Sequence, residues 1–198
     1  MSRFTDSTAR KERVSALNRE HTLSLKKDFD PVAALEIAND FLQKTKDLYA
    51  KAEIAGSLRR KEAVVHDIDF AVIPAKDNLA AWKEEVTKRV EAIGGSSKTF
   101  SDTMSDFLYI GVQVNLFLCP AENSWGVTLM WATGPKGHTI GMTLKAQKKQ
   151  LLYNSQGIWT RDEPRKLIPT RTEMDVARVL DWKYKSPELR GKGETKSE

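Results

Sequence analysis

One stretch of the chain, residues 54–73, constrains the fold most, because it combines a turn signal with a closely spaced acidic pair. Gly56 and Ser57 come first, and Asp67 and Asp69 stand directly before an apolar run. Alternate residues of a β-strand point to the same face, so the two carboxylates are expected side by side. The stretch therefore predicts a turn with a short helix, followed by a strand that carries an acidic pair.

This arrangement predicts both a metal site and a phosphate site. Two neighbouring carboxylates repel each other unless a cation lies between them, and Mg²⁺ completes its coordination with phosphate oxygens. The backbone N–H groups at the start of a short helix after Gly56-Ser57 are a favourable seat for a phosphate. Asp67 and Asp69 are therefore candidate metal ligands, and the chemistry indicated is nucleotidyl transfer.

The same stretch resembles the signature of family X DNA polymerases, the relatives of polymerase beta. The matching residues are Gly56-Ser57, the pair Arg59-Arg60 and Asp67-Ile68-Asp69. The resemblance extends over about residues 31–190, because Thr133-Gly134 and Trp182-Lys183-Tyr184 follow in the family's order. It implies an α+β fold with a nucleotidyltransferase palm, a mixed β-sheet backed by helices, and a small C-terminal thumb. In lacking a lyase part the chain is similar to the shortest viral members.

The resemblance implies roles for individual residues. Asp67, Asp69 and the position of Asn115 would be catalytic and would hold two Mg²⁺ ions, with Mn²⁺ as an alternative. The residues implied in nucleotide binding are Gly56, Ser57, Arg60, Trp131, Thr133 and Gly134. Those implied in DNA binding are Lys145, Lys148 and Lys149. The implied partners are a nucleoside triphosphate and primer–template or gapped DNA.

Asn115 departs from the family pattern, which has a carboxylate at this position of the long β-rich segment. An amide is uncharged, offers one oxygen and cannot act as a base, so it is a poor Mg²⁺ ligand. Three interpretations remain open: an introduced inactivating substitution, which we favour, a natural loss of activity, or tolerance of the amide.

A second departure concerns sugar selection. The family often has Tyr-Phe before Thr-Gly, and this chain has Trp131-Ala132. We expect weaker rejection of ribonucleotides, although Trp131 would equally suit packing between palm and thumb. Small or polar residues around Thr139 and Thr143 stand where the family reads the minor groove.

The pattern of apolar and turn residues divides the chain into four parts. These are a flexible arm (1–30), the palm (31–125), the thumb (126–190) and a tail (191–198). Helices are predicted from Pro31 to about Tyr49, over 79–93, over 136–150 and after the Thr172 cap. Strands are predicted over 97–100 and, as one long strand, over 107–118, with a hairpin over 151–159.

Charge is distributed unevenly along the chain. Residues 1–135 contain 18 Lys and Arg against 19 Asp and Glu, whereas residues 136–198 contain 14 against 8. A basic C-terminal third predicts a polyanionic partner. The single cysteine, Cys119, excludes an intrachain disulfide and is expected in the core. Without an apolar run of membrane-spanning length or a secretory signal, we expect a soluble monomer with no membrane partner.

The function that these observations favour is a DNA polymerase of family X type that adds dNTP units to a primer 3′-hydroxyl, in gap filling or repair. Two alternatives remain. One is a template-independent nucleotidyltransferase acting on RNA or a small acceptor, and the other is a catalytically dead module that binds nucleic acid or nucleotide. A zinc site is not expected, because the three histidines lack metal-ligand spacing.

Overall fold

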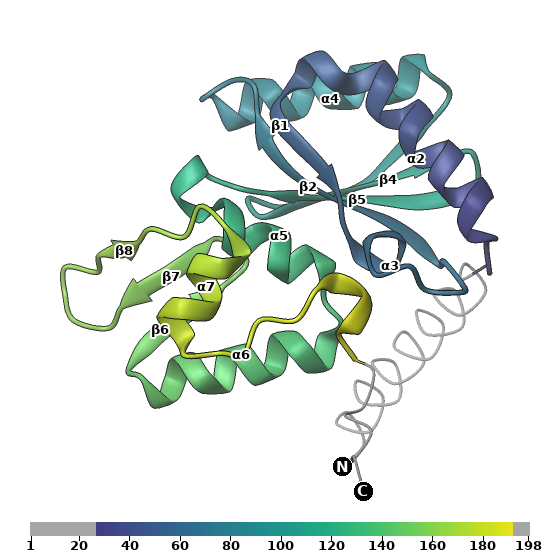
Figure 1. Cartoon of the computed structure of the whole chain (residues 1–198). Helices are drawn as coiled ribbons and strands as arrows, with labels where there is room; N and C mark the ends of the chain where they lie inside the picture. Colours follow the sequence, from purple (N-terminus) through teal and green to yellow (C-terminus); the bar gives the residue numbers. More distant parts are fainter. Residues whose placement is uncertain (1–26, 192–198) are drawn as a thin grey trace, which may run out of the picture.

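The structure, a computed structural model, describes residues 27–191. All of the predicted tail except residue 191, and all of the predicted arm except residues 27–30, therefore lie outside the described residues. The chain forms a five-stranded sheet with its helices and, below it in Figure 1, a smaller unit with a three-stranded sheet. Among the described residues, no helix is long and apolar enough to cross a membrane.

The first unit, which we call the palm, is built on a mixed sheet. Its strands in spatial order are β1 (Tyr49–Ile54), β2 (Asp67–Pro74), β5 (Val112–Leu118), β4 (Met104–Tyr109) and β3 (Ser96–Phe100). Only the β2–β5 pair is parallel, and the other neighbouring pairs are antiparallel. Helices α2 (Pro31–Thr45) and α4 (Leu79–Ala92) cover one face, and the short helix α3 (Gly56–Arg59) joins β1 to β2 (Figure 1). This is the predicted α+β architecture.

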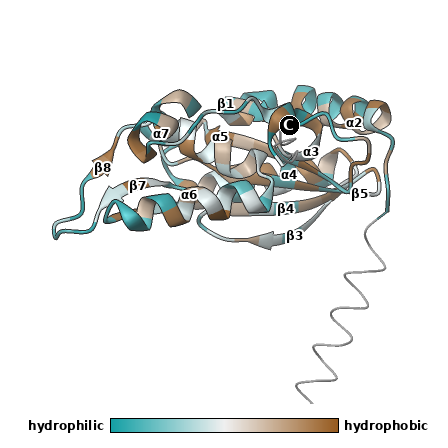
Figure 2. Ribbon diagram, turned by 60° about the horizontal axis from the view of Figure 1, so that its bottom comes forward, coloured by the Kyte–Doolittle hydropathy of each residue, from teal (hydrophilic) through white to brown (hydrophobic). Residues whose placement is uncertain are grey.

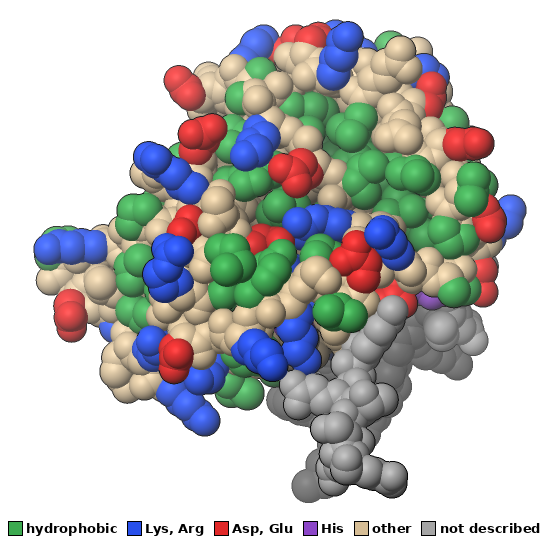
Figure 3. All heavy atoms as spheres, in the orientation of Figure 1, with side chains coloured by type: hydrophobic (Ala, Val, Ile, Leu, Met, Phe, Trp, Pro, Cys, Tyr) green, Lys and Arg blue, Asp and Glu red, His purple; other side chains and the backbone are tan. Residues whose placement is uncertain are grey.

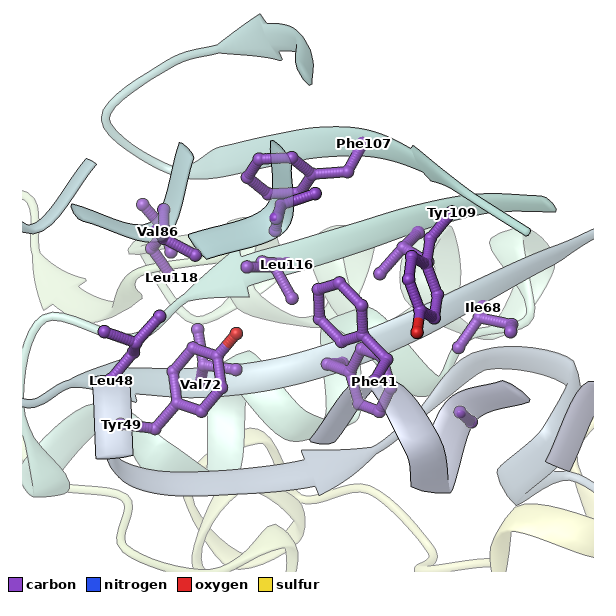
Figure 4. Packing of buried hydrophobic residues seen from close by; sticks show 14 of the residues in the cluster. Phe41, Leu48, Tyr49, Ile68, Val72, Val86, Phe107, Tyr109, Leu116 and Leu118 are labelled. Atoms are coloured by element: carbon purple, nitrogen blue, oxygen red, sulfur yellow. The ribbon is translucent and has the colours of Figure 1, made fainter. Parts of the chain in front are cut away.

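The palm core lies between the sheet and helices α2 and α4. Phe41 of α2 contacts Phe70 of β2, with ring centroids 5.7 Å apart. It also contacts Tyr109 of β4, with ring centroids 5.4 Å apart (Figure 4). Trp82 of α4 is fully buried, and its indole N–H donates to the Leu48 carbonyl at 2.6 Å. This side chain is a packing residue, and the core leaves the opposite face of the sheet free to carry polar groups.

The predicted long strand over 107–118 is wrong in one respect, because it is two antiparallel strands. Ile110 and Gly111 both have positive φ, of 48° and 77°, and turn the chain between β4 and β5. A two-residue turn of this kind normally carries Asn-Gly or Asp-Gly. The β-branched Ile110 disfavours this conformation, so the sequence gives no turn signal here.

The first helix is shorter than predicted. Asp30 caps α2 as expected, with its carboxylate accepting from the Val32 and Ala33 N–H groups. The helix ends at Thr45 and continues as a 3₁₀ turn, η1 (Lys46–Leu48), so that Tyr49 already belongs to β1. Leu48, the last residue of the 3₁₀ turn, is buried in the core. The apolar pattern of the sequence therefore continues beyond the end of the α-helix.

The second unit, the thumb, follows α5 (Trp125–Thr133) and the 3₁₀ turn η2 (Glu122–Ser124). It contains α6 (Lys136–Lys148), the three-stranded sheet, α7 (Glu173–Leu180) and the 3₁₀ turn η3 (Pro187–Leu189). The sheet consists of β6 (Leu151–Asn154), β7 (Gly157–Thr160) and a short third strand that the sequence did not predict, β8 (Leu167–Ile168). Thr172 and Asp175 form the predicted capping box at the start of α7. Hydrophilic and hydrophobic residues alternate along α6 (Figure 2).

Helix α5 contributes to two cores. Trp125 and Leu129 pack in a cluster with Cys119 and with Ala55 and Ala71 of the palm. On another side of the helix, Val127 and Met130 pack in the thumb core, which also contains Met142, Ile158 and Leu180. The predicted boundary between residues 125 and 126 falls at the first residues of this shared helix, and the division into domains stays a prediction.

Candidate active site

Asp67 and Asp69 lie at the start of β2, in the interior of the sheet and on the face opposite the palm core. The strand positions between and after them, Ile68 and Phe70, are fully buried in that core. Alternation along the strand therefore turns both carboxylates to the other face, as predicted. The Ala55 N–H donates to the Asp69 carbonyl at 2.7 Å, which fixes β1 and the start of α3 beside the acidic pair.

Gly56 allows α3 to approach Asp69 closely. Its φ is +57°, and a Cβ at this position would lie 2.1 Å from Asp69 Oδ2. Only glycine therefore fits both the backbone conformation and the space. Ser57 follows at the N-terminus of α3, and its Oγ is buried without a hydrogen-bond partner among the described residues. The predicted phosphate seat thus lies against the predicted metal ligands.

A cleft of about 630 Å³ joins this acidic pair to the thumb. Its palm side is lined by Arg60, Asp67, Asp69 and Phe117, and its other side by the residues from Trp131 to Lys136 together with Thr139, Ile140 and Thr143. The structure thus brings Arg60, Trp131, Thr133 and Gly134 together with the two aspartates. Arg60 also donates to the Thr133 carbonyl, which holds the two sides of the cleft together.

Trp131 has surroundings that suit both of the uses considered for it. It lines the cleft, and its ring lies 5.4 Å from that of Tyr153 in the thumb hairpin. Ala132 beside it is buried in the cluster around α5. The contact with Tyr153 therefore holds the Trp131 ring in place beside the cleft.

Asn115 lies beside Asp69, because the two residues are paired in the parallel β2–β5 register. It is 6% exposed, and its Nδ2 donates to Asp69 Oδ1 at 2.8 Å. Desolvation and the charge of Asp67 raise the pKa of Asp69 to about 7, against the lowering effect of this hydrogen bond. Burial and the like charge of Asp67 therefore oppose ionisation of Asp69, and the Asn115 N–H favours it.

The donor set fits one Mg²⁺ better than two. Asp67 and Asp69 offer the carboxylate oxygens that one Mg²⁺ uses together with substrate phosphates. The third position has only the Asn115 Oδ1, which already accepts from Gln113 Nε2 at 2.9 Å. Within residues 27–191, no group of three His, Cys, Asp or Glu side chains is arranged to hold a metal ion. The residues present thus fit a single ion at Asp67 and Asp69.

A buried ion-pair network behind the cleft was not predicted. Arg59 of α3 donates to both carboxylate oxygens of Glu173 at 2.7 and 3.0 Å, and to Thr133 Oγ1 at 2.8 Å. Arg190, which is 1% exposed, lies 3.0 Å from the same Glu173 carboxylate. The Tyr184 hydroxyl donates to Glu173 Oε2 at 3.3 Å. This network joins the palm helix α3 to the thumb helix α7.

One further polar residue near the acidic pair was also missed. Asp106 of β4 pairs with Asn115 in the antiparallel register, and its Oδ1 is buried without a hydrogen-bond partner among the described residues. Desolvation raises the pKa of Asp106, and the charge of Lys98 opposes this. Only the alternation of side chains along β4 could have placed Asp106 on this face. Because the turn at Ile110 was not predicted, β4 was not predicted as a separate strand.

The predicted DNA-binding lysines lie at the C-terminal end of α6, away from the residues that line the cleft. Lys148 and Lys149 are exposed, and Lys145 lies 3.9 Å from Asp181. In Figure 3, several Lys and Arg side chains lie on the surface over α6 and the thumb hairpin, which Figure 1 shows in the same orientation. Lys148 and Lys149 thus lie on the surface of the thumb, and a role of these lysines in DNA binding stays a prediction.

Comparison with known proteins agrees with this fold. Residues 128–191 match the family model described as DNA polymerase beta thumb. The crystal structure of Leishmania infantum polymerase beta, a ternary P/T complex, is similar with a TM-score of 0.72 at 16% identity. The match covers 86% of this chain and 79% of that chain. A comparison with curated proteins gives no match. The predicted fold and the predicted resemblance to polymerase beta are therefore confirmed.

Proposed function

We propose that this family X polymerase-like protein is a DNA polymerase that extends a primer by one nucleotide at a time in gap filling or repair. The primer 3′-hydroxyl would attack the α-phosphate of a dNTP and release pyrophosphate. One observation supports the proposal most strongly: the cleft combines Asp67 and Asp69 of the palm with Thr133-Gly134 and the start of the basic thumb helix α6.

Each group in the cleft has a role in this reaction. Asp67 and Asp69 would hold the Mg²⁺ of the incoming Mg²⁺-dNTP, and the ion would neutralise charge on the phosphates. Gly56, Ser57 and Arg60 would bind the β- and γ-phosphates, which uses the Ser57 Oγ that has no partner in the described chain. Thr133 and Gly134 would position the sugar and base beside Trp131. A second ion, Mg²⁺ or Mn²⁺, would need the position that Asn115 occupies.

Primer extension tests the proposal against its alternatives. The substrates are gapped DNA, a recessed primer–template and a single strand, each offered deoxy- and ribonucleotides. The proposal predicts slow extension that requires a template. Extension of the single strand would favour the template-independent transferase. Binding without extension, even after Asn115→Asp, would favour the catalytically dead module, for which Asn115 itself is the supporting observation.

DNA binding is expected to depend on the thumb lysines. Lys148→Glu combined with Lys149→Glu should weaken binding to any sequence and reduce the slope of log affinity against log salt by about 2. Fluorescence anisotropy with labelled gapped DNA at several salt concentrations measures both. Lys46→Glu with Lys88→Glu makes the same charge change on palm elements away from the cleft and should leave the slope unchanged. Equal effects of the two double variants would contradict a specific thumb contact.

Discrimination against ribonucleotides is expected to be weaker than in relatives with Tyr-Phe before Thr-Gly. Ala132 is too small to crowd the 2′ position of the sugar, so selection would fall to Trp131 alone. The measurement is the ratio of incorporation efficiencies for a matched deoxy- and ribonucleotide, made with the Asn115→Asp variant. A ratio as large as that of a Tyr-Phe relative would show that Trp131 or another side chain still excludes the 2′-hydroxyl.

A further inference from the structure

Four side chains form a continuous line of hydrogen bonds from the edge of the palm sheet to the acidic pair. Lys98 Nζ on β3 donates to Gln113 Oε1 at 3.3 Å. Gln113 Nε2 donates to Asn115 Oδ1 at 2.9 Å, and Asn115 Nδ2 donates to Asp69 Oδ1 at 2.8 Å. We call these four residues the polar relay.

The lysine end of the relay determines how its amides are oriented. A lysine ammonium can only donate. Gln113 must therefore turn its oxygen to Lys98 and its nitrogen to Asn115, and Asn115 must turn its nitrogen to Asp69. As a result the only oxygen of the Asn115 side chain is already engaged, and an N–H dipole points at the carboxylate where a metal ion would otherwise lie.

We infer that the polar relay takes the place of a cation in this site, so that the site is stable without metal and binds no second ion beside Asn115. The inference rests on the proposed function only in treating Asp67 and Asp69 as the nucleotide's metal ligands. The Asn115 N–H provides the positive partner that a buried carboxylate needs. A carboxylate at position 115 would remove that donor, add a second negative charge beside Asp69, and make the site depend on a bound ion.

Thermal unfolding in the absence of nucleotide and DNA tests this inference. The unchanged protein should have the same midpoint in a chelator and in Mg²⁺ or Mn²⁺. In the chelator, the Asn115→Asp variant should unfold at a midpoint roughly 4–8 °C below that of the unchanged protein. Addition of Mn²⁺ should restore the midpoint of the variant. The variant should also bind one more Mn²⁺ than the unchanged protein when free Mn²⁺ is followed by electron paramagnetic resonance.

Gln113→Met tests the relay without changing Asn115. It keeps the length of the side chain but removes the donor, so the Asn115 oxygen becomes free. This variant should gain more stability from Mn²⁺ than the unchanged protein does, and less than Asn115→Asp. It also keeps the inference testable if Asn115→Asp does not fold in the chelator.

Asn154→Asp is the matched control for the change of charge. Asn154 Oδ1 accepts from the Gln156 N–H at 2.8 Å, and an aspartate keeps that bond. Its midpoint should not respond to Mn²⁺. The inference is overturned if the unchanged protein is stabilised by Mn²⁺ as strongly as Asn115→Asp, or if Asn115→Asp and Gln113→Met do not respond to the ion. These readings need no catalysis, so an inactive polymerase would contradict the proposed function and leave this inference standing.

Discussion

Asn115→Asp is expected to increase the rate of nucleotide incorporation by about 10²–10³-fold. The substitution converts a neutral amide, whose oxygen accepts from Gln113, into a charged ligand beside Asp69. A metal ion bound there would lower the pKa of the primer 3′-hydroxyl and stabilise the charge that develops during attack. The unchanged protein lacks this ligand, so its chemical step should be slow even though the residues proposed to bind the nucleotide are present.

Single-turnover primer extension at several dNTP concentrations separates rate from affinity. The maximal rate should rise in Asn115→Asp, whereas the apparent dNTP affinity should change little, because the nucleotide would be bound through Asp67, Asp69 and the Gly56-Ser57 turn. Asn154→Asp, which makes the same chemical change on the thumb hairpin, should leave the rate unaltered. If the unchanged protein already extends primers at about 1 s⁻¹ or faster, which is typical of enzymes, the role assigned to position 115 is wrong.

Glu173→Gln is expected to destabilise the protein by about 3–5 kcal/mol. Glu173 is 7% exposed and is the shared partner of Arg59 and the buried Arg190. Removing its charge leaves two guanidinium groups without their counter-ion, one of them almost completely buried. The variant should also loosen the join between palm and thumb, because α3 and α7 meet through this carboxylate.

The pH dependence of stability gives the same network a second test. Burial alone would raise the pKa of Glu173, but Arg59 and Arg190 outweigh it and lower the pKa below its usual value. The contribution of the network should therefore be complete above the pKa of an unfolded glutamate, about 4.3, and be lost as pH falls towards the folded value. Glu173→Gln should remove this dependence.

Urea unfolding compares Glu173→Gln with Glu84→Gln. Glu84 pairs with Lys88 on the exposed side of α4, so its loss should change stability little. Equal stabilities of the two variants would contradict a structural role for the buried network.

Local signals in the sequence were sufficient for several elements, including the strand that carries the acidic pair. The Asp30-Pro31 start of α2, the Thr172 capping box and the alternation through Asp67 and Asp69 depend on residues close together in the chain. Each therefore leaves a pattern in a short window of sequence. The turn at Ile110 was not predicted, because Ile110 does not favour the positive φ that it adopts.

Long-range partners could not be found in this way. Arg59 and Glu173 are 114 positions apart in sequence, and Asn115 and Asp69 are 46 apart. The relay depends on the register of four neighbouring strands, β2, β5, β4 and β3. Neither Lys98 nor Gln113 has a local feature that marks it. Both polar networks follow from the arrangement of the sheet and thumb, which the sequence reveals only after the fold is known.

Nucleotide selection on gapped DNA tests the central claim most directly. The Asn115→Asp variant is given a duplex with a one-nucleotide gap, and each of the four dNTPs is offered separately for each templating base. The account predicts that the complementary nucleotide is incorporated far more efficiently than the other three, and that adding Asp69→Asn abolishes incorporation. Equal incorporation of all four, or incorporation that persists without Asp69, would contradict template-directed nucleotidyl transfer at this site.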